Sequence, residues 1–205
     1  MKKSTRPLLV LATGNPGKVA ELQHLLRGVP IEPATATDLG LALPADEPYA
    51  TFLENAKHKA LFVAEQTPLL VLGEDSGLEV DALGGKPGVL SKRYSGLQGN
   101  AEDNNTKLLR ELREVPRPQR MARFQCVAAL AAAGRVLFTA SGACEGLIAD
   151  DTRGTGGFGY DPLFYLPVKY LTMAELSAAE KNHISHRSRA LEKVIAFIRQ
   201  YASDA

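Results

Sequence analysis

The chain has 205 residues, of which 45% are hydrophobic, and a formal net charge of +1 at pH 7. This composition supplies enough apolar material for a core, and the near-neutral charge excludes a role that depends on nonspecific attraction to nucleic acid or to a membrane surface. The length suits one large domain, and no apolar run is long enough to span a bilayer. We therefore expect one domain, residues 1–205, of a cytoplasmic protein with its two cysteines in the core.

The first apolar run, residues 8–12, predicts a buried strand that leads into a glycine-containing loop. After this loop we expect a helix that begins at about Lys18 and ends at Gly28. A strand, a glycine loop and a helix start present backbone N–H groups and the positive end of a helix dipole to an anion. Lys18 adds a charge there, and Thr13 and Asn15 add side-chain donors. The same pattern also suits an ordinary turn between a strand and a helix.

Thr51 and Glu54 have the spacing of a capping box, which predicts a helix from Phe52 onward. Its apolar face leaves three residues outside: Lys57, His58 and Lys59. Capping explains Glu54, but no local structure explains Glu47 in the preceding loop. Glu47 is therefore a candidate ligand for a cation.

Four apolar residues, 69–72, predict a strand that is buried on both faces and ended by Gly73. Glu74 and Asp75 follow where we expect this strand to leave the sheet. Ligands of open α/β sheets gather at the carboxyl ends of strands, so the position suits acid chemistry or a hard cation. Such a pair is also common in solvated turns. The rival acidic pair, Asp150–Asp151, has no apolar strand directly before it.

Further along, residues 78–81 predict a half-buried strand and residues 101–114 a helix. Two strands, 122–132 and 135–145, are joined at Ala133–Gly134 and predict an antiparallel hairpin. Together with the buried strands, this hairpin favours an α/β fold with a bent or divided sheet and a central cleft over a purely parallel sheet.

Four glycines lie within residues 154–159, around Phe158 and just before Tyr160. Glycines at this density indicate positive φ angles or a ligand pressed against the backbone. An aromatic ring held among glycines suits stacking on a base. The alternative is a tight loop whose aromatic rings pack on the core.

Thr172 and Glu175 form a second capping-box pattern, which predicts a short helix that reaches about Asn182. Ser185 is placed to cap the final helix. His186 and Arg187 then fall in the first turn of that helix, where a cation opposes the helix dipole unless an anion or a carbonyl group faces it. Alternatively, both side chains are solvated.

Six segments of the chain, taken in this order, resemble the inosine/xanthosine triphosphate pyrophosphatase family, whose members clear deaminated purine nucleotides. These segments are 13–18, 52–56, 74–78, 84–88, 156–162 and 180–187. The resemblance implies a homodimer, a long mixed β-sheet with flanking helices that forms two lobes around a central substrate cleft, and Mg²⁺-dependent release of pyrophosphate.

The resemblance also implies the roles of individual residues. Asp75 would be the general base and a metal-bound carboxylate, with Glu74 and Glu47 as further metal ligands. Many relatives carry Asp–Asp where this chain has Glu74–Asp75, so the division of work within that pair stays open. The implied substrate-binding residues are Thr13, Gly14, Asn15, Pro16, Gly17 and Lys18 for the triphosphate, and Ser76, Phe158, Gly159, Tyr160, Asp161, Lys181, His186 and Arg187 for the base and nearby groups, with Phe158 stacked on the purine.

The resemblance therefore implies an enzyme that hydrolyses non-standard purine nucleoside triphosphates (ITP, dITP and XTP) to the monophosphate and pyrophosphate, which would keep deaminated purines out of DNA and RNA. A triphosphate carries about four negative charges and needs both amide donors and a hard cation. Donors such as Arg187 or Lys181 would donate hydrogen bonds to a 6-keto oxygen, whereas the amino group of adenine would leave them without an acceptor. The alternatives are a pyrophosphatase for other modified nucleotides and a non-catalytic nucleotide sensor, and the acidic cluster argues against the sensor.

Overall fold

The computed structural model describes residues 6–203 as one mixed β-sheet with helices packed against it. The strand order is β2-β1-β3-β4-β5-β6-β7. Strand β1 pairs in parallel with β2 and β3, whereas β6 pairs antiparallel with β5 and β7. The mixed sheet of the predicted α/β fold is thereby confirmed. The strands are β1 Leu8–Leu11, β2 Glu32–Thr35, β3 Leu70–Val80, β4 Met121–Ala132, β5 Arg135–Ile148, β6 Phe164–Leu166 and β7 Leu171–Thr172.

The first two α-helices each begin after a residue whose side chain caps the helix N-terminus. Thr51 caps α2 as predicted. Asn15 caps α1, which begins at Pro16, two residues before the expected start, because proline is well tolerated at the first helical position. No helix within residues 6–203 combines the length and the apolarity needed to cross a membrane. The α-helices are α1 Pro16–Leu25, α2 Phe52–Ala64, α3 Ala101–Glu111, α4 Ala178–Ile184 and α5 His186–Ser203.

The elements fall into two compact units, and each unit is described by itself below. Unit 1 comprises Met1–Asp75, Val127–Ser141 and Ser188–Ala205, and unit 2 comprises Ser76–Cys126 and Gly142–Arg187. The single domain, the two lobes and the central cleft that the sequence suggests stay predictions.

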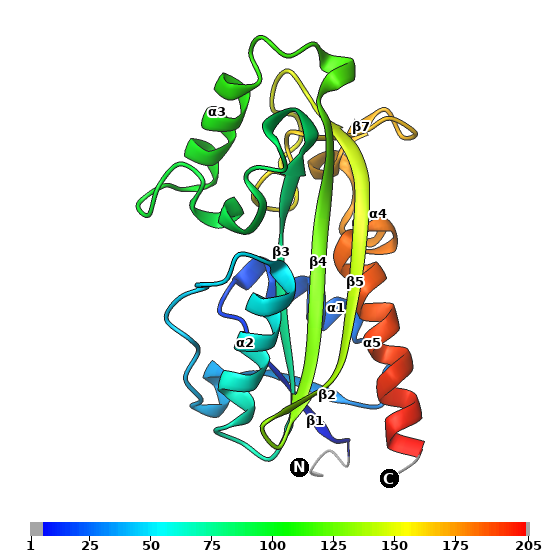
Figure 1. The fold of residues 1–205 in the computed structure, drawn as a ribbon. Helices are drawn as coiled ribbons and strands as arrows, with labels where there is room; N and C mark the ends of the chain where they lie inside the picture. Colours follow the sequence, from blue (N-terminus) through cyan, green and yellow to red (C-terminus); the bar gives the residue numbers. More distant parts are fainter. Residues whose placement is uncertain (1–5, 204–205) are drawn as a thin grey trace. The chain divides into compact units, whose positions relative to one another are not determined.

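Small side chains allow α2 to pack closely on the strands of unit 1. Val10 and Val71 belong to one buried cluster with Ala56 and Ala60 of α2. A Cβ atom added to Gly73 would lie 2.5 Å from the Ala56 carbonyl oxygen and 2.6 Å from the Ala60 nitrogen. Glycine is therefore needed here for helix packing. In Figure 1, α2 lies on one side of these strands and α5 on the other.

Strand β3 continues without interruption from Leu70 to Val80. The predictions that Gly73 ends a strand and that residues 78–81 form a separate one are therefore wrong. Gly73 looked like a strand end because glycine often marks turns, whereas here it lets a helix approach. Glu74 and Asp75 consequently lie inside a strand, where successive side chains point to opposite faces of the sheet.

The core of unit 2 holds larger side chains, including Leu78, Phe124, Ile148 and Phe164, and both cysteines are buried as predicted. Ala133 and Gly134, with φ angles of 49° and 70°, form the predicted two-residue turn between β4 and β5.

One predicted helix near the C-terminus is divided in two. The capping box of Thr172 and Glu175 is present, but it opens only a 3-10 turn, Met173–Glu175. Leu176 is extended, with a ψ angle of 148°, so the turn cannot continue as a helix. Ser177 then opens α4 through a capping box of its own with Glu180. The final helix begins at His186, directly after Ser185, as predicted.

Candidate functional site

In unit 1, one buried lysine holds two of the predicted metal-binding carboxylates together. The Lys59 Nζ atom lies 2.9 Å from Asp75 Oδ1 and 3.1 Å from the backbone oxygen of Glu74, and it also forms an ion pair with Glu47. The Lys59 and Asp75 side chains are 9% and 4% exposed, and the Glu47 side chain is 24% exposed. A buried ammonium group needs such partners, because an uncompensated charge in the interior is costly.

The sequence analysis placed Lys59 outside the packed face of α2, and this prediction is wrong. Residues Ala56, Lys59, Ala60 and Val63 are all buried on one side of the helix. Their spacing of three or four residues was visible in the sequence. The burial of Lys59 depends on carboxylates from other segments, which the helical spacing alone does not reveal.

Asn55 is a second residue that the sequence analysis did not assign to the site. Its side chain is fully buried. The Asn55 Oδ1 atom accepts a hydrogen bond of 3.0 Å from the Tyr49 N–H, and Nδ2 donates one of 3.1 Å to the Tyr49 carbonyl oxygen. These two hydrogen bonds to the backbone of Tyr49 fix the loop that carries Glu47 two positions earlier.

The cluster shifts the titration of both members of the Lys59–Asp75 pair. Burial is the largest influence on Asp75 and raises the pKa of its carboxyl group, although the charges of Lys59 and Lys18 lessen the rise. Burial acts to lower the pKa of Lys59, but the attraction of Asp75 and Glu47 outweighs it and raises that pKa overall. Asp75 is therefore more basic than an ordinary aspartate and lies beside a charged lysine.

One oxygen of Asp75 is available to a ligand. Among the residues that the structure describes, none donates a hydrogen bond to the buried Asp75 Oδ2 atom. A buried acceptor without a donor costs about 1–3 kcal/mol. This arrangement suits an atom that binds a cation or accepts a proton during a reaction.

Glu74 lies on the other face of β3, where its Oε1 atom is 2.8 Å from Lys18 Nζ. Asp75 and Glu47 share the contact with Lys59, whereas Glu74 is paired with Lys18, so the metal site of Asp75, Glu74 and Glu47 stays a prediction. Within residues 6–203, no group of three or more His, Cys, Asp or Glu side chains is placed to hold a metal ion. Two neighbours in a continuous strand point to opposite faces, so only Asp75 and Glu47 come together.

The loop of residues 13–18 is ordered by its own side chains. Asn15 Oδ1 accepts hydrogen bonds from the N–H groups of Gly17 and Lys18, at 2.9 and 3.2 Å, and Thr13 Oγ1 accepts one of 3.2 Å from the Asn15 N–H. Two N–H groups that we expected to face an anion are thus bonded to Asn15 instead. The role of Asn15 as a side-chain donor to a ligand stays a prediction.

In unit 2, the predicted base-binding residues gather around Phe158. Asp161 Oδ2 accepts hydrogen bonds from Lys181 Nζ, at 2.5 Å, and from the Phe158 N–H, at 2.7 Å. Lys181 Nζ lies 4.7 Å from the centroid of the Phe158 ring, and Arg187 Cζ lies 5.7 Å from it. Arg187, which is 1% exposed, also donates a hydrogen bond of 3.0 Å to Ser76 Oγ. Five predicted residues therefore form one group.

The glycines beside Phe158 have the positive φ angles that the sequence predicted: 72° at Gly157 and 65° at Gly159. At Gly157 space is also restricted, because an added Cβ atom would lie 2.0 Å from Asp161 Oδ2. The half-buried Phe158 ring is therefore held on a loop that only glycine can form at these positions.

Tyr160 and His186 pack into the core of unit 2. The Tyr160 hydroxyl donates a hydrogen bond of 2.8 Å to the Ser91 carbonyl oxygen, and the side chain is 5% exposed. The Tyr160 ring therefore packs in the core, as the alternative for this loop predicts, and a role of Tyr160 in substrate binding stays a prediction. His186 stacks on Phe124, with the ring centroids 4.9 Å apart, so it is not solvated.

The rival acidic pair is an ordinary surface feature. Asp150 and Asp151 are exposed, and they lie 3.0 Å from Arg120 and 4.0 Å from Arg153, respectively. Exposed ion pairs of this kind contribute little and do not constitute a metal site.

Comparison with known proteins found similar sequences and structures over most of the chain. The model of the Ham1 family matches residues 9–197. A dITP/XTP pyrophosphatase of Geobacter sulfurreducens is 50% identical over 183 residues, which cover 89% of this chain and 92% of that protein. A dITP/XTP pyrophosphatase of Shigella flexneri is 46% identical over 193 residues, which cover 93% of this chain and 98% of that protein. Among solved structures, a HAM1 protein from Coxiella burnetii has a TM-score of 0.86 and 40% sequence identity, and the match covers 95% of this chain and 99% of that chain.

Proposed function

The chain belongs to the Ham1 family, and from this premise we propose that it hydrolyses non-standard purine nucleoside triphosphates to the nucleoside monophosphate and pyrophosphate. The observation that carries the proposal is the buried Asp75 carboxylate: its Oδ1 atom is bonded to Lys59, and its Oδ2 atom has no hydrogen-bond partner within residues 6–203. The dITP/XTP pyrophosphatases among the similar proteins indicate ITP, dITP and XTP as the substrates. The reaction removes deaminated purines before they enter DNA or RNA. We place it in the cytoplasm, and we propose a homodimer on the family resemblance.

Asp75 activates the attacking water. As the water oxygen attacks the α-phosphorus, its proton passes to Asp75 Oδ2, and the bond between the α-phosphorus and the oxygen that leads to the β-phosphate breaks. The raised pKa of Asp75 favours this transfer, since a more basic carboxylate is a better proton acceptor near neutral pH. Lys59 holds this carboxylate in place through its bond to Oδ1.

The loop of residues 13–18 binds the triphosphate. Lys18 contributes a positive charge, Asn15 Nδ2 is available as a donor, and the N-terminus of α1 favours an anion. The phosphate group competes with Glu74 for Lys18. Charge accumulates on pyrophosphate as it leaves, so Lys18 stabilises the transition state more than the bound substrate.

Asp75 and Glu47 are suited to hold Mg²⁺. Both are carboxylates, the ligands that this hard cation prefers, and both contact the same Lys59 Nζ atom, so they converge on one point. When bound, Mg²⁺ polarises the phosphoryl oxygens of the substrate. Glu74 is not part of this ligand set.

Residues around Phe158 bind the base. Phe158 stacks on the purine, and Asp161 fixes both the Phe158 backbone and Lys181. Lys181 or Arg187 donates to the 6-keto oxygen of hypoxanthine or xanthine. Adenine presents an amino group there, which leaves a buried donor without an acceptor. Ser76, Gly159, Asp161 and His186 complete the surroundings of the base.

The test is pyrophosphate release from a panel of triphosphates (ITP, dITP, XTP, ATP and a modified pyrimidine triphosphate), with Mg²⁺ and with EDTA. We expect release from the three non-standard purine nucleotides, little from ATP, and none in EDTA. Equal rates with ITP and ATP would contradict the base assignment. Binding of ITP without any release would instead identify a nucleotide sensor.

A further inference from the structure

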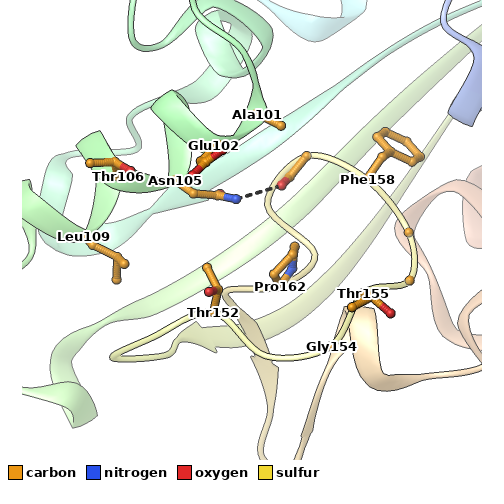
Figure 2. A pocket seen from close by; sticks show the side chains of 13 residues that line it. Ala101, Glu102, Asn105, Thr106, Leu109, Thr152, Gly154, Thr155, Phe158 and Pro162 are labelled. Carbon is orange, nitrogen blue, oxygen red and sulfur yellow. Dashed lines mark hydrogen bonds between the residues drawn. The ribbon is translucent and has the colours of Figure 1, made fainter.

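A cavity of about 510 Å³ separates α3 from the glycine loop in unit 2. It is lined on one side by residues of α3 from Ala101 to Leu109 and on the other by residues 154–159 (Figure 2). Because van der Waals attraction requires atoms in contact, a cavity of this size leaves the loop with little packing support from α3.

A single hydrogen bond between side chain and backbone crosses from α3 to this loop. Asn105 Nδ2 donates to the Gly159 carbonyl oxygen over 3.1 Å, and Figure 2 shows this bond as a dashed line. Asn105 is 7% exposed and Gly159 is half-buried, so the bond is partly shielded from water. Gly159 directly follows Phe158, and glycines on both sides of Phe158 give the loop no stiffness of its own. Asp161 fixes the Phe158 N–H, and Asn105 fixes the next carbonyl group along the chain.

The helix that carries Asn105 is itself firmly held. The adjacent Asn104 donates to the carbonyl oxygen of Lys92 over 3.1 Å and accepts from the Ser95 N–H over 2.7 Å. Asn100 caps α3 in a full capping box. The Asn105 amide is thus carried by a well-held helix, so its hydrogen bond can restrain the Gly159 carbonyl group of the loop.

The second polar atom of Asn105 indicates that this residue does not mainly serve stability. Within residues 6–203, the buried Asn105 Oδ1 atom has no hydrogen-bond partner. A buried amide with only one of its two polar atoms bonded adds little to the free energy of folding, because the cost of the unpaired acceptor offsets the gain from the bonded donor.

We propose that Asn105 is a positioning residue for base recognition: its bond to Gly159 holds the Phe158 ring in the orientation that stacks on the purine. This inference rests on the proposed function and extends it to a helix outside the residues assigned above. Without the bond, the loop samples other conformations, and the substrate must order it before stacking. Binding of the base weakens, whereas the chemistry at the α-phosphorus is unaffected.

The test is Asn105→Leu, which keeps a similar size and removes the donor. We expect KM for ITP and for ATP to rise about fivefold, the loss that corresponds to an ordinary hydrogen bond of about 1 kcal/mol, and kcat to change less than about twofold. Inorganic triphosphate, an inhibitor without a base, should keep its inhibition constant. The matched control is Thr106→Val, which changes a neighbouring residue in the same cavity lining and should leave KM unchanged.

A double mutant separates positioning from general damage. In the Phe158→Ala background, Asn105→Leu should raise KM less than about twofold, because the ring that it positions is gone. Full additivity of the two changes, or a weaker inhibition by inorganic triphosphate, would overturn the inference. If Asn105→Leu does not fold, Asn105→Ala provides the same test.

The same measurements distinguish failure of the inference from failure of the proposed function. If Phe158→Ala raises KM and Asn105→Leu does not, only the role of Asn105 is wrong. If Phe158→Ala itself leaves KM unchanged, the stacking assignment fails and the inference with it.

Discussion

The Lys59 ammonium and the Asp75 carboxylate are both buried, and they lie 2.9 Å apart on the face of β3 that α2 covers. Neither group is stable alone in that position, because each offsets the charge of the other. The relationship explains how an apolar face of a helix accommodates a lysine. It also keeps Asp75 Oδ1 bonded and leaves Oδ2 for chemistry.

Removal of the lysine charge should damage both stability and activity. Lys59→Met keeps the aliphatic chain but leaves Asp75 and Glu47 facing each other without a cation, so we expect the free energy of unfolding to fall by about 3 kcal/mol or more. Chemical denaturation measures this change. Pyrophosphate release from ITP should fall at least about 100-fold, since the general base loses its support. The control is Lys57→Met on the same helix, and equal stability of the two variants would contradict the prediction.

Asp75→Asn should keep the fold and abolish turnover. The amide retains the shape of the side chain and an oxygen for Lys59, but it ligates Mg²⁺ poorly and cannot accept the proton of water. We expect kcat with ITP to fall by about three orders of magnitude or more. Asp151→Asn, a change at an exposed aspartate, should stay active. Near-normal turnover in a folded Asp75→Asn protein would exclude Asp75 as the base.

The two glutamates should respond differently to magnesium. Glu47→Gln removes a proposed ligand beside Asp75, so the Mg²⁺ concentration for half-maximal activity should rise at least about tenfold. Glu74→Gln lies on the opposite face of β3 and should leave that concentration unchanged. Titration of activity with MgCl₂ measures both values. A larger effect at Glu74 than at Glu47 would show that the metal is bound on the other face.

Affinity for the base and discrimination between bases should be separable. Phe158→Ala removes stacking worth about 1–3 kcal/mol for any purine, so kcat/KM should fall alike for ITP and ATP. Arg187→Ala removes a proposed donor to the 6-keto oxygen, so it should reduce kcat/KM for ITP far more than for ATP. The measurement is the ITP-to-ATP ratio in both variants at saturating Mg²⁺. An unchanged ratio in Arg187→Ala would move the base-reading role to Lys181.

Gly73→Ala should destabilise the protein through overpacking. The new methyl group would meet the backbone of α2, at Ala56 and Ala60, which cannot move aside as a flexible side chain would. We expect a loss of about 1–3 kcal/mol in the free energy of unfolding. Gly14→Ala, where the nearest atom belongs to the flexible Leu43 side chain at 3.3 Å, should cost less. A thermal melt of both variants shows the difference.

Features that depend on neighbours in the sequence were predictable. The cap at Thr51, the turn at Ala133–Gly134 and the positive φ angles around Phe158 follow from the local chemistry of a few adjacent residues. The family was also recognisable from the sequence, because its short motifs keep their order along the chain. The sequence therefore determined the type of fold and the chemistry of the reaction.

Only the tertiary structure decided which side chains meet. Lys59 lies 16 positions from Asp75, and Asn105 lies 54 positions from Gly159, so no local pattern relates them. The continuity of β3 through Gly73 depended on the close approach of α2, and it placed Glu74 and Asp75 on opposite faces. Burial of a charge or an amide is stable only when a distant segment supplies its partner, and that partner is known only once the chain has packed.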